Sequence, residues 1–350
     1  MQFTVPPALE PGDQVAVIAP ASGLAAAYPE VYELGLERLR EVFDLDPVEY
    51  PTATADDEYL REHPEERARD VMDAFRDPDI QGVIATIGGN DQIRILEHVD
   101  PDVLAEHPTR FYGQSDNTNL AAMLWREGVV SYYGGALLTD LATYGGIPEY
   151  AERYLRRAFF EESHGALSPA DEVTDKDVDW GGFPDVEADP EYEPSPGWTF
   201  RGGDAPATGR TWGGCLEVID LLLASDRCVP SVEAGDEDLV LCLETSEELP
   251  GAGAVERTVT ALGERGLLER ASAVLVGRAK ARSHVVDRPP EERAAYRDRQ
   301  RDAVERVAAR YDPDLPLVFD LEFGHTIPTA AVPLGARVTV DPREETIVFE

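Results

Sequence analysis

The sequence of 350 residues predicts an α/β protein with two domains, and three observations support this. The length suits two domains of ordinary size. Apolar residues make up 43% of the chain, which is enough for sizeable cores. In the first 160 residues, short apolar runs alternate with segments whose apolar residues recur at helical spacing. Such alternation is typical of a parallel sheet with helices on both faces.

The first domain is expected over residues 1–160. Its first apolar run, VAVIA at 15–19, lies between Gly12-Asp13 and Pro20 and is typical of a strand buried on both faces. A helical pattern follows at 29–43. The alternation then predicts helices at 64–76, 91–98 and 117–127 and strands at 82–89, 110–113 and 129–133.

Residues 161–207 are rich in Pro, Gly, Asp and Glu and poor in aliphatic residues, which predicts a linker or a functional loop. The second domain, expected over 208–350, is mixed α/β and less regular. Its expected elements are helices at 214–224, 253–265 and 290–310, strands at 239–244 and 273–276, and a final hairpin around Asp341-Pro342.

The charge is strongly negative: 69 acidic residues against 31 basic ones give a net charge of −38. A surface of this sign repels phosphates and anionic lipids, so neither nucleic acid nor a membrane is expected as a partner. Lysine occurs only at Lys176 and Lys280. Acid-rich, lysine-poor chains suit concentrated salt, and a halophilic host is inferred; an ordinary acidic cytosolic protein is the alternative.

The cysteines and the N-terminus point to a reducing compartment. Cys215, Cys228 and Cys242 are odd in number and have no CxxC spacing, which argues against a disulfide framework and against a zinc site. The N-terminus lacks the basic and apolar regions of a secretory signal. No run approaches the ~20 apolar residues that span a bilayer. We therefore expect a cytoplasmic protein.

The segment GQSDN, 113–117, places Ser115 between a short strand and a helix, two residues after Gly113. A serine at such a turn can act as a nucleophile, while N–H groups at the helix start stabilise an oxyanion. Asn117 stands where the usual nucleophile elbow has its second glycine. An ordinary turn with Ser or Asp as a helix cap is the competing interpretation.

The segment TIGGND, 86–91, ends an apolar strand with Gly88 and Gly89. Paired glycines let a ligand approach the backbone, and open α/β sheets bind ligands beyond the carboxyl ends of their strands. Asn90 and Asp91 follow as candidate substrate-binding residues. A tight turn in which one of them caps the next helix explains the same residues.

The second half of the sequence contains a candidate general base and a candidate carboxylate partner for it. His325 stands beside Gly324 in FGHTIPTAAVPLG, and histidine is the usual general base near neutral pH. Glu244 ends the apolar strand LVLCLE, where a carboxylate projects into a cleft. The remaining histidines are expected at the surface: His63, His98, His107, His164 and His284.

Together these residues suggest acyl transfer. A serine hydroxyl needs an adjacent base, and the base needs an acid that fixes its tautomer. The N–H groups of Asp116 and of the Gly88-Gly89 turn could form the oxyanion hole. Since the serine and the histidine come from different halves, the site is expected between the domains.

Six segments follow one another in the order seen in LD-carboxypeptidases, the serine peptidases that trim bacterial muropeptides. These segments are VAVIAPAS, GVIATIGGND, FYGQSDNTNL, TWGGCLEVI, LVLCLE and FGHTIPTAAVPLG. The resemblance spans nearly the whole chain. The run GGNDQIR, 88–94, resembles most the branch with the microcin C self-immunity peptidase, which hydrolyses the amide between an aspartyl residue and a nucleotide-like phosphoramide, or releases a related aminoacyl-adenylate mimic.

The resemblance implies a flavodoxin- or glutamine-amidotransferase-like parallel-sheet domain, then a mixed α/β domain with a swivelling-type sheet. It implies homodimers and catalysis without metal or cofactor. It assigns Ser115 as nucleophile, Glu244 and His325 as its partners, and Gly89 and Asp116 as oxyanion donors.

Two departures affect the pocket rather than the reaction. Gln114 replaces an aromatic residue common before the nucleophile, and Ile327 stands where a second histidine is frequent. Trp180 could stack on a nucleobase, as in the microcin branch, or simply pack the domain junction.

We therefore predict a serine carboxypeptidase or amidase acting on a small peptide or an aminoacyl-nucleotide-like substrate. The alternatives are an LD-carboxypeptidase acting on muropeptides, a non-catalytic binding protein of the same fold, and an α/β-hydrolase esterase. A salt-adapted archaeon would lack muropeptides, which favours the first function over the second. The absence of a second elbow glycine and of an HGGG-type segment argues against the esterase.

Overall fold

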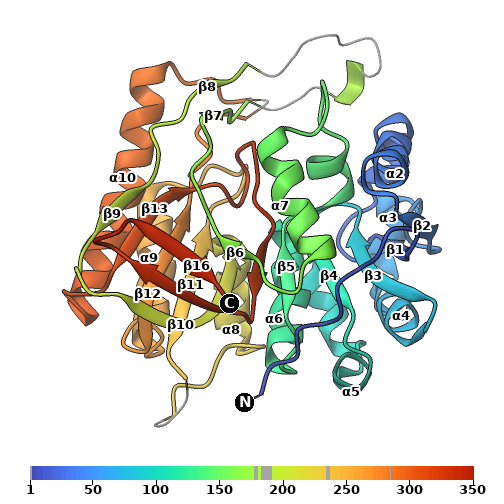
Figure 1. Ribbon diagram of the computed structural model, residues 1–350, viewed down its shortest axis with the longest axis horizontal. Helices are drawn as coiled ribbons and strands as arrows, with labels where there is room; N and C mark the ends of the chain where they lie inside the picture. Colours follow the sequence, from blue (N-terminus) through green and yellow to red (C-terminus); the bar gives the residue numbers. More distant parts are fainter. Residues whose placement is uncertain (1, 177–179, 183–190, 234–236, 284) are drawn as a thin grey trace.

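Two β-sheets stand side by side, each with helices against its faces (Figure 1). The computed structural model describes residues 2–176, 180–182, 191–233, 237–283 and 285–350. Both sheets are rich in parallel strands, so the predicted two-domain α/β class is confirmed. Within the described residues, no helix is long and apolar enough to cross a membrane.

The first sheet has the strand order β14-β5-β4-β3-β1-β2. Its pairs are parallel except for β14, which runs antiparallel to β5. The strands are β1 (Gln14–Ile18), β2 (Asp46–Glu49), β3 (Ile80–Ala85), β4 (Arg110–Gly113), β5 (Ser131–Tyr133) and β14 (Val332–Leu334).

Both faces of the first sheet are buried, as its apolar runs predict. Val15 and Val17 pack under α2 (Pro29–Phe43), η3 (Leu137–Leu141) and α7 (Glu149–Phe160). Ala16 and Ile18 point the other way, because side chains alternate along a strand, and pack under α4 (Pro64–Arg76), α5 (Pro101–Glu106) and α6 (Thr118–Arg126). The short helices α1 (Leu24–Ala27), α3 (Asp57–Glu62) and η1 (Gln92–Glu97) lie between these elements.

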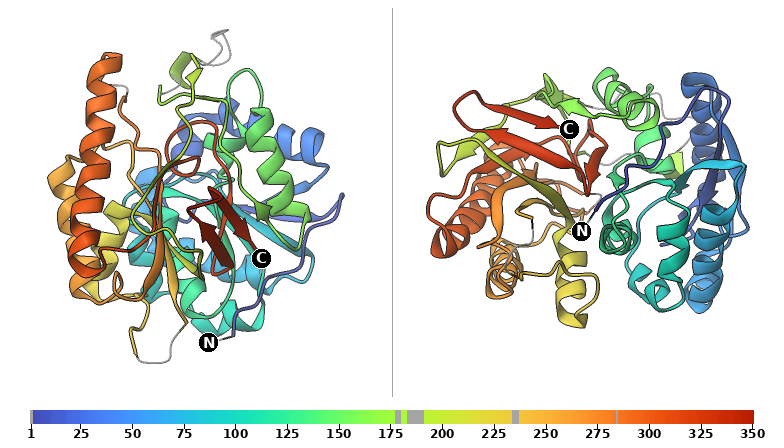
Figure 2. Two further views of the ribbon diagram at one scale, coloured as in Figure 1. Left: turned by 60° about the vertical axis from the view of Figure 1, so that its left-hand side comes forward. Right: turned by 60° about the horizontal axis from the view of Figure 1, so that its bottom comes forward.

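The second sheet has the order β6-β16-β15-β10-β11-β12-β13-β9, with a parallel centre and antiparallel edges. Its yellow-to-orange helices lie together against one face (Figure 2), and the red C-terminal hairpin forms part of the sheet itself. The helices are α8 (Leu216–Ser225), α9 (Ala252–Glu264) and α10 (Pro290–Tyr311). The central strands are β10 (Ala207–Cys215), β11 (Leu239–Glu244), β12 (Ala271–Gly277) and β13 (Leu317–Leu321), and the hairpin is β15 (Arg337–Asp341) with β16 (Thr346–Phe349).

Residues 161–207, expected as a linker or loop, contribute short strands to the second sheet and form a small sheet of their own. They supply the edge strands β6 (Gly165–Ala166) and β9 (Thr199–Arg201), and β7 (Glu172–Val173) pairs with β8 (Glu193–Pro194). Strands of two or three residues are too short to show a period. Residues 177–179 and 183–190 of this segment lie outside the described residues.

The two expected domains also exchange a strand. The chain leaves the second sheet after β13, adds β14 to the first sheet, and returns to the second sheet as β15. The two halves therefore share a backbone ladder as well as side-chain contacts.

One expected surface histidine is buried. His164 is 4% exposed and lies between the rings of Tyr154 and Phe349. Burial, with Arg157 nearby, lowers the pKa of His164 to about 3. The surface prediction for His164 was wrong because ring packing across the chain leaves no local pattern; His284 lies outside the described residues.

Candidate active site

Ser115 lies at a sharp turn between β4 and α6, in the 3₁₀ turn η2 (Ser115–Asn117). Its φ is +61°, in the left-handed region that non-glycine residues seldom adopt. Backbone strain of this kind is typical of nucleophile turns, because it lifts the hydroxyl away from the sheet. The Ser115 N–H donates to the Tyr133 hydroxyl (2.9 Å), which helps to hold the strained turn.

Asn117, which replaces the second glycine of the usual elbow, braces this turn. Its Nδ2 donates to the carbonyls of Ile87 (3.1 Å) and Gln114 (3.0 Å). Its Oδ1 accepts from Gln92 (2.7 Å). The asparagine thus connects the Ser115 turn to the end of β3, which is a structural reason for the departure.

Gly88 packs directly against the serine. A Cβ on Gly88 would lie 2.7 Å from the Ser115 Cβ and 3.1 Å from its Oγ, so no side chain fits there. The same Cβ would be 3.4 Å from the Asp116 N atom, so Gly88 packs against both Ser115 and the residue after it. The Asp116 carboxylate points away and accepts from the Gln92 N–H (2.8 Å) and from Asn119 (2.8 Å). Burial raises the pKa of Asp116 to about 6.

His325 and Glu244 form a hydrogen-bonded pair. The imidazole Nδ1 lies 2.8 Å from Glu244 Oε2, and the glutamate side chain is 1% exposed. Gly324 makes this approach possible: its φ is +102°, and a Cβ there would lie 2.5 Å from the same Oε2. The glycine before the histidine is therefore required by the carboxylate that packs on it.

Tyr133 connects the serine to this pair. Its hydroxyl donates to Glu244 Oε1 (2.6 Å) and accepts from the Ser115 N–H (2.9 Å). A chain of contacts thus runs from the first sheet through Tyr133 and Glu244 to His325. The Ser115 N–H is already engaged by the Tyr133 hydroxyl in this chain of contacts.

A second carboxylate faces the other imidazole nitrogen. Glu247 Oε2 lies 2.9 Å from His325 Nε2, and its side chain is 57% exposed. Burial disfavours the imidazolium, but Glu244 and Glu247 outweigh it and raise the pKa of His325 to about 10. The hydrogen bond from His325 lowers the pKa of Glu247 to about 2. Without substrate, the histidine is thus held as an imidazolium between two carboxylates.

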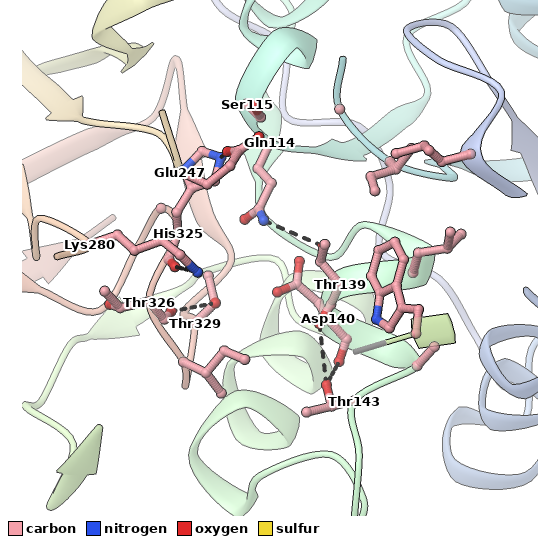
Figure 3. A pocket seen from close by; sticks show the side chains of 18 of the residues that line it. Gln114, Ser115, Thr139, Asp140, Thr143, Glu247, Lys280, His325, Thr326 and Thr329 are labelled. Atoms are coloured by element: carbon pink, nitrogen blue, oxygen red, sulfur yellow. Dashed lines mark hydrogen bonds and ion pairs between the residues drawn. The ribbon is translucent and has the colours of Figure 1, made fainter. Parts of the chain in front are cut away.

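Ser115, His325 and Glu247 line a cavity of about 330 Å³ between the halves (Figure 3). Gly88, Gly89 and Ser115 belong to its wall on the first half, and Glu247, Lys280 and His325 to its wall on the second. Threonines and Asp140 line the floor, where burial raises the pKa of Asp140 to about 6. The lining is mixed, with polar groups around the serine and aliphatic side chains beyond them.

The candidate substrate-binding residues divide into two groups. Trp180 lines the cavity, and its ring meets that of Tyr28 edge-on at 5.3 Å. Gly88 lines it as well. Asn90 and Asp91 are not among the lining residues, and Asp91 pairs instead with Arg67 (2.8 Å) and Arg94 (3.3 Å). The structure therefore brings Gly88 and Trp180 to the site and not Asn90 or Asp91.

The segment before Trp180 is fastened to the His325 loop. Thr174 and Ile327 exchange two backbone hydrogen bonds, of 2.7 and 2.9 Å. The next residue, Asp175, is 2% exposed and pairs with three arginines of the second half. They are Arg282 (2.6 Å), Arg297 (2.6 Å) and Arg293 (3.5 Å).

Three residues of the site were not predicted from the sequence as site residues. Tyr133 lies in a Tyr-Tyr strand pair, and Glu247 in a loop rich in acids, so neither has a distinctive pattern. Lys280 did offer a signal, since lysine occurs only twice in the chain. In the part of the chain that the structure describes, no group of three His, Cys, Asp or Glu side chains is arranged to hold a metal ion.

Comparison with known proteins decides the family. Residues 15–134 match the model of the LD-carboxypeptidase N-terminal domain, and residues 208–340 match that of the C-terminal domain. The chain belongs to the LD-carboxypeptidase family. It is accordingly a hydrolase of the serine peptidase class.

Relatives with carboxypeptidase names cover almost the whole chain. A Vibrio cholerae protein, provisionally named a carboxypeptidase, is 28% identical over 98% of this chain and 96% of its own. A Bacillus subtilis protein, provisionally named a murein peptide carboxypeptidase, is 27% identical over 99% of this chain and 94% of its own. The microcin C7 self-immunity protein MccF of Escherichia coli is 22% identical over 79% and 75%.

Solved structures agree with these matches. The MccF-like protein from Streptococcus pneumoniae, in complex with AMP, superposes with a TM-score of 0.85 at 25% identity. The superposition covers 97% of this chain and 99% of that one. The predicted resemblance to LD-carboxypeptidases and to MccF-like proteins is confirmed.

Proposed function

We propose that this chain is a serine carboxypeptidase or amidase that hydrolyses an amide bond in a small peptide or peptidyl-nucleotide-like substrate. Ser115 is the nucleophile, His325 the general base and Glu244 the residue that orients the histidine. The single observation that carries this proposal is the pairing of His325 Nδ1 with Glu244 (2.8 Å) in the cavity that Ser115 lines. The pairing fixes the tautomer that leaves Nε2 to accept a proton.

In the first half of the reaction, the Ser115 Oγ attacks the amide carbon while its proton moves to His325 Nε2. The N–H groups of Asp116 and the Gly88-Gly89 turn stabilise the oxyanion. When the intermediate collapses, the C–N bond breaks and His325 gives the proton to the leaving nitrogen. An acyl-Ser115 ester remains, which water hydrolyses with His325 as base again.

Glu247 must move for this to happen. Its carboxylate occupies the Nε2 side of His325 and stabilises the imidazolium, which cannot take a proton. An exposed carboxylate on a loop can turn into solvent when substrate enters the cavity. Deprotonation of His325 then follows, because one of its two anionic partners has left.

Two observations bear on the substrate. The MccF-like protein of Streptococcus pneumoniae holds AMP, and Trp180 offers a ring in the cavity, which supports a nucleotide-like leaving group. The whole-length match to the Bacillus subtilis protein named for murein peptides supports the second candidate, a muropeptide LD-carboxypeptidase. A single experiment separates the two.

Purified protein in high salt is offered two substrates, with Ser115→Ala as control. One is a tetrapeptide whose last linkage joins an L residue to a free D-alanine. The other is an acyl-capped aspartyl sulfamoyl adenosine. We expect turnover of the second substrate, lost by roughly 10⁴-fold or more in Ser115→Ala. The variant should melt like the wild type, because a serine side chain contributes little packing.

Cleavage of the tetrapeptide alone would assign the chain to muropeptide processing. Turnover retained in Ser115→Ala would overturn the nucleophile assignment. Absence of turnover with both substrates, with a Ser115 unreactive toward a fluorophosphonate, would favour a binding protein of the same fold.

A further inference from the structure

The two lysines of this chain meet in one place. Of 31 basic residues only Lys176 and Lys280 are lysines, and both line the cavity. They and His325 are the cationic side chains among the described lining residues. In a chain with a net charge of −38, both lysines thus line one cavity, together with the carboxylates of Asp140 and Glu247. Local positive charge in a cleft concentrates anionic ligands.

Lys280 is the more buried of the two lysines and lies beside the histidine. It follows β12 and is 7% exposed, and its Nζ is 3.4 Å from the His325 carbonyl oxygen. Figure 3 shows the side chain running alongside His325 with its nitrogen turned toward the cavity. The charge of an ammonium in a buried position reaches further than it does in water.

The position beside His325 determines which part of a substrate Lys280 meets. The histidine gives its proton to the leaving nitrogen, so the leaving fragment must lie against His325. In a peptide with a free C-terminus, the carboxylate stands two bonds from that nitrogen. In an acyl sulfamate or phosphoramide, the negative charge is equally close. A cation beside the general acid therefore faces the anionic group of the leaving fragment.

We infer that Lys280 is the specificity-determining residue that binds an anionic group of the leaving fragment next to the scissile nitrogen. The inference rests on the proposed function and deepens it by naming the substrate class. A terminal carboxylate and an acyl sulfamate share this chemistry.

The protein's own Glu247 supports this role. Its carboxylate already occupies the space at His325 Nε2 (2.9 Å), and Lys280 contributes to the low pKa of that carboxylate after His325. A carboxylate therefore fits and is stabilised at this position. We interpret Glu247 as a stand-in for the substrate anion, which the substrate displaces.

The other charged groups that line the cavity are less suited to bind the anionic group of the leaving fragment. Asp140 lies across the cavity from Lys280 (Figure 3) and accepts from the Ala136 N–H (2.9 Å). It would repel an anion. Lys176 is more exposed than Lys280 and pairs with Glu191 (3.0 Å). Of the two lysines, Lys280 is thus the one that contacts the residue carrying the base.

Binding tests the inference without requiring turnover. In a Ser115→Ala background, titration calorimetry measures the affinity for a tetrapeptide with a free terminal carboxylate and for its terminal carboxamide. A second pair compares an acyl-capped aspartyl sulfamoyl adenosine with the matching aspartyl anilide, whose leaving group is neutral. We expect the anionic member of at least one pair to bind about 30-fold more tightly, the range of one charge-assisted contact.

Adding Lys280→Met should reduce that preference to within about threefold, with the neutral partner nearly unaffected. Adding Glu247→Gln should strengthen binding of the anionic ligand alone, because its competitor is gone. Arg343→Met is the matched control for net charge. Arg343 lies on the turn between β15 and β16, is exposed and pairs with Asp204. It should leave both affinities unchanged.

Equal binding of anionic and neutral ligands by Ser115→Ala would overturn the inference. This outcome needs no change at Lys280, so the inference can be refuted even if Lys280→Met does not fold. A preference that survives Lys280→Met would overturn it too. Failure of the proposed function is a separate outcome, visible as absence of turnover by the wild type while the binding preference persists.

Discussion

At the residue scale, His325 is held on both sides by carboxylates, and this arrangement sets what each substitution should do. Glu244 holds Nδ1 and Glu247 holds Nε2. The Glu244 side chain is buried, whereas the Glu247 side chain is 57% exposed. We therefore assign Glu244 as the residue that orients His325 and Glu247 as the residue that moves.

Removing the base should be as damaging as removing the nucleophile. His325→Ala should lower kcat/KM roughly 10⁴-fold, as Ser115→Ala does, because triad members act as a unit. His107→Ala, at an exposed helix end, is the control and should keep full activity. Steady-state kinetics on the substrate that the wild type cleaves provides the measurement. A loss below about tenfold would place the base elsewhere.

Glu247→Gln should change the pH dependence of activity. The base must be neutral, so activity rises as pH passes through the pKa of His325. Glu244 and Glu247 raise that pKa despite burial, while Tyr133, Lys280 and Asp140 also face this region. With the Glu247 charge gone, the pKa falls, and the rising limb of kcat/KM should move about one unit or more toward acid pH.

Glu248→Gln is the matched control for this profile. It makes the same change one residue further along the loop, and in the described structure the Glu248 carboxylate is not hydrogen-bonded to His325. Its profile should follow the wild type. If the rising limb of the kcat/KM profile stayed at the same pH in Glu247→Gln, the contact at Nε2 would not control the pKa of His325.

At this scale the sequence predicted what short motifs reveal. Ser115, Glu244 and His325 each stand at a strand end beside a distinctive neighbour, so motif order was enough to propose them. Tyr133 could not be predicted, because only the sheet register decides whether Tyr132 or Tyr133 turns toward Glu244. Glu247 and Glu248 differ likewise only by loop geometry.

At the scale of elements, the segment 172–176 is fastened both to the His325 loop and to the arginines of the second half. Two backbone hydrogen bonds between Thr174 and Ile327 join the segment to the loop, and Asp175 anchors it among three arginines. Arg297 and Arg282 lower the pKa of Asp175 although burial opposes them. Loosening this anchor should therefore affect both stability and substrate binding.

Asp175→Asn should lower the free energy of unfolding by about 3–5 kcal/mol, because a buried charge cluster loses one partner and keeps the others. KM should rise, since Lys176 follows directly and lines the cavity. Chemical denaturation and kinetics measure the two effects. Asp204→Asn, which breaks the exposed pair with Arg343, is the control and should change stability by no more than about 0.5 kcal/mol. Equal effects of the two changes would contradict the anchoring role.

Length decided much of what was predictable, although the twelve-residue helix α7 was not predicted and the three-residue strand β5 was. The helices α8, α9 and α10 and the strands β1, β4 and β11 have enough residues to show a period. β6, β9 and β14 have two or three residues each and exist because a neighbouring strand offers an open edge. Such pairings depend on contacts far apart in sequence, so no local pattern could reveal them.

At the scale of the whole molecule, the dominant property is charge. With a net charge of −38, like charges repel across a folded surface and destabilise the compact state. The Debye length falls from about 30 Å at 0.01 M salt to about 3 Å at 1 M, so salt removes most of this repulsion.

The melting temperature should therefore rise by several degrees between low and molar KCl. Differential scanning fluorimetry measures it, with a non-ionic osmolyte as the control for general solvent effects. A melting temperature independent of KCl would contradict the inferred adaptation to salt. The homodimer implied by the resemblance stays a prediction, which sedimentation velocity in high salt would test.

The most direct test of the account is to find which residue reacts. The protein is treated with a fluorophosphonate in high salt at mildly alkaline pH, and the adduct is located by peptide mass spectrometry. We predict a single adduct on Ser115, absent in Ser115→Ala and formed far more slowly in His325→Ala. An adduct on another residue, or labelling of Ser115 at an undiminished rate in His325→Ala, would contradict the proposed catalytic site.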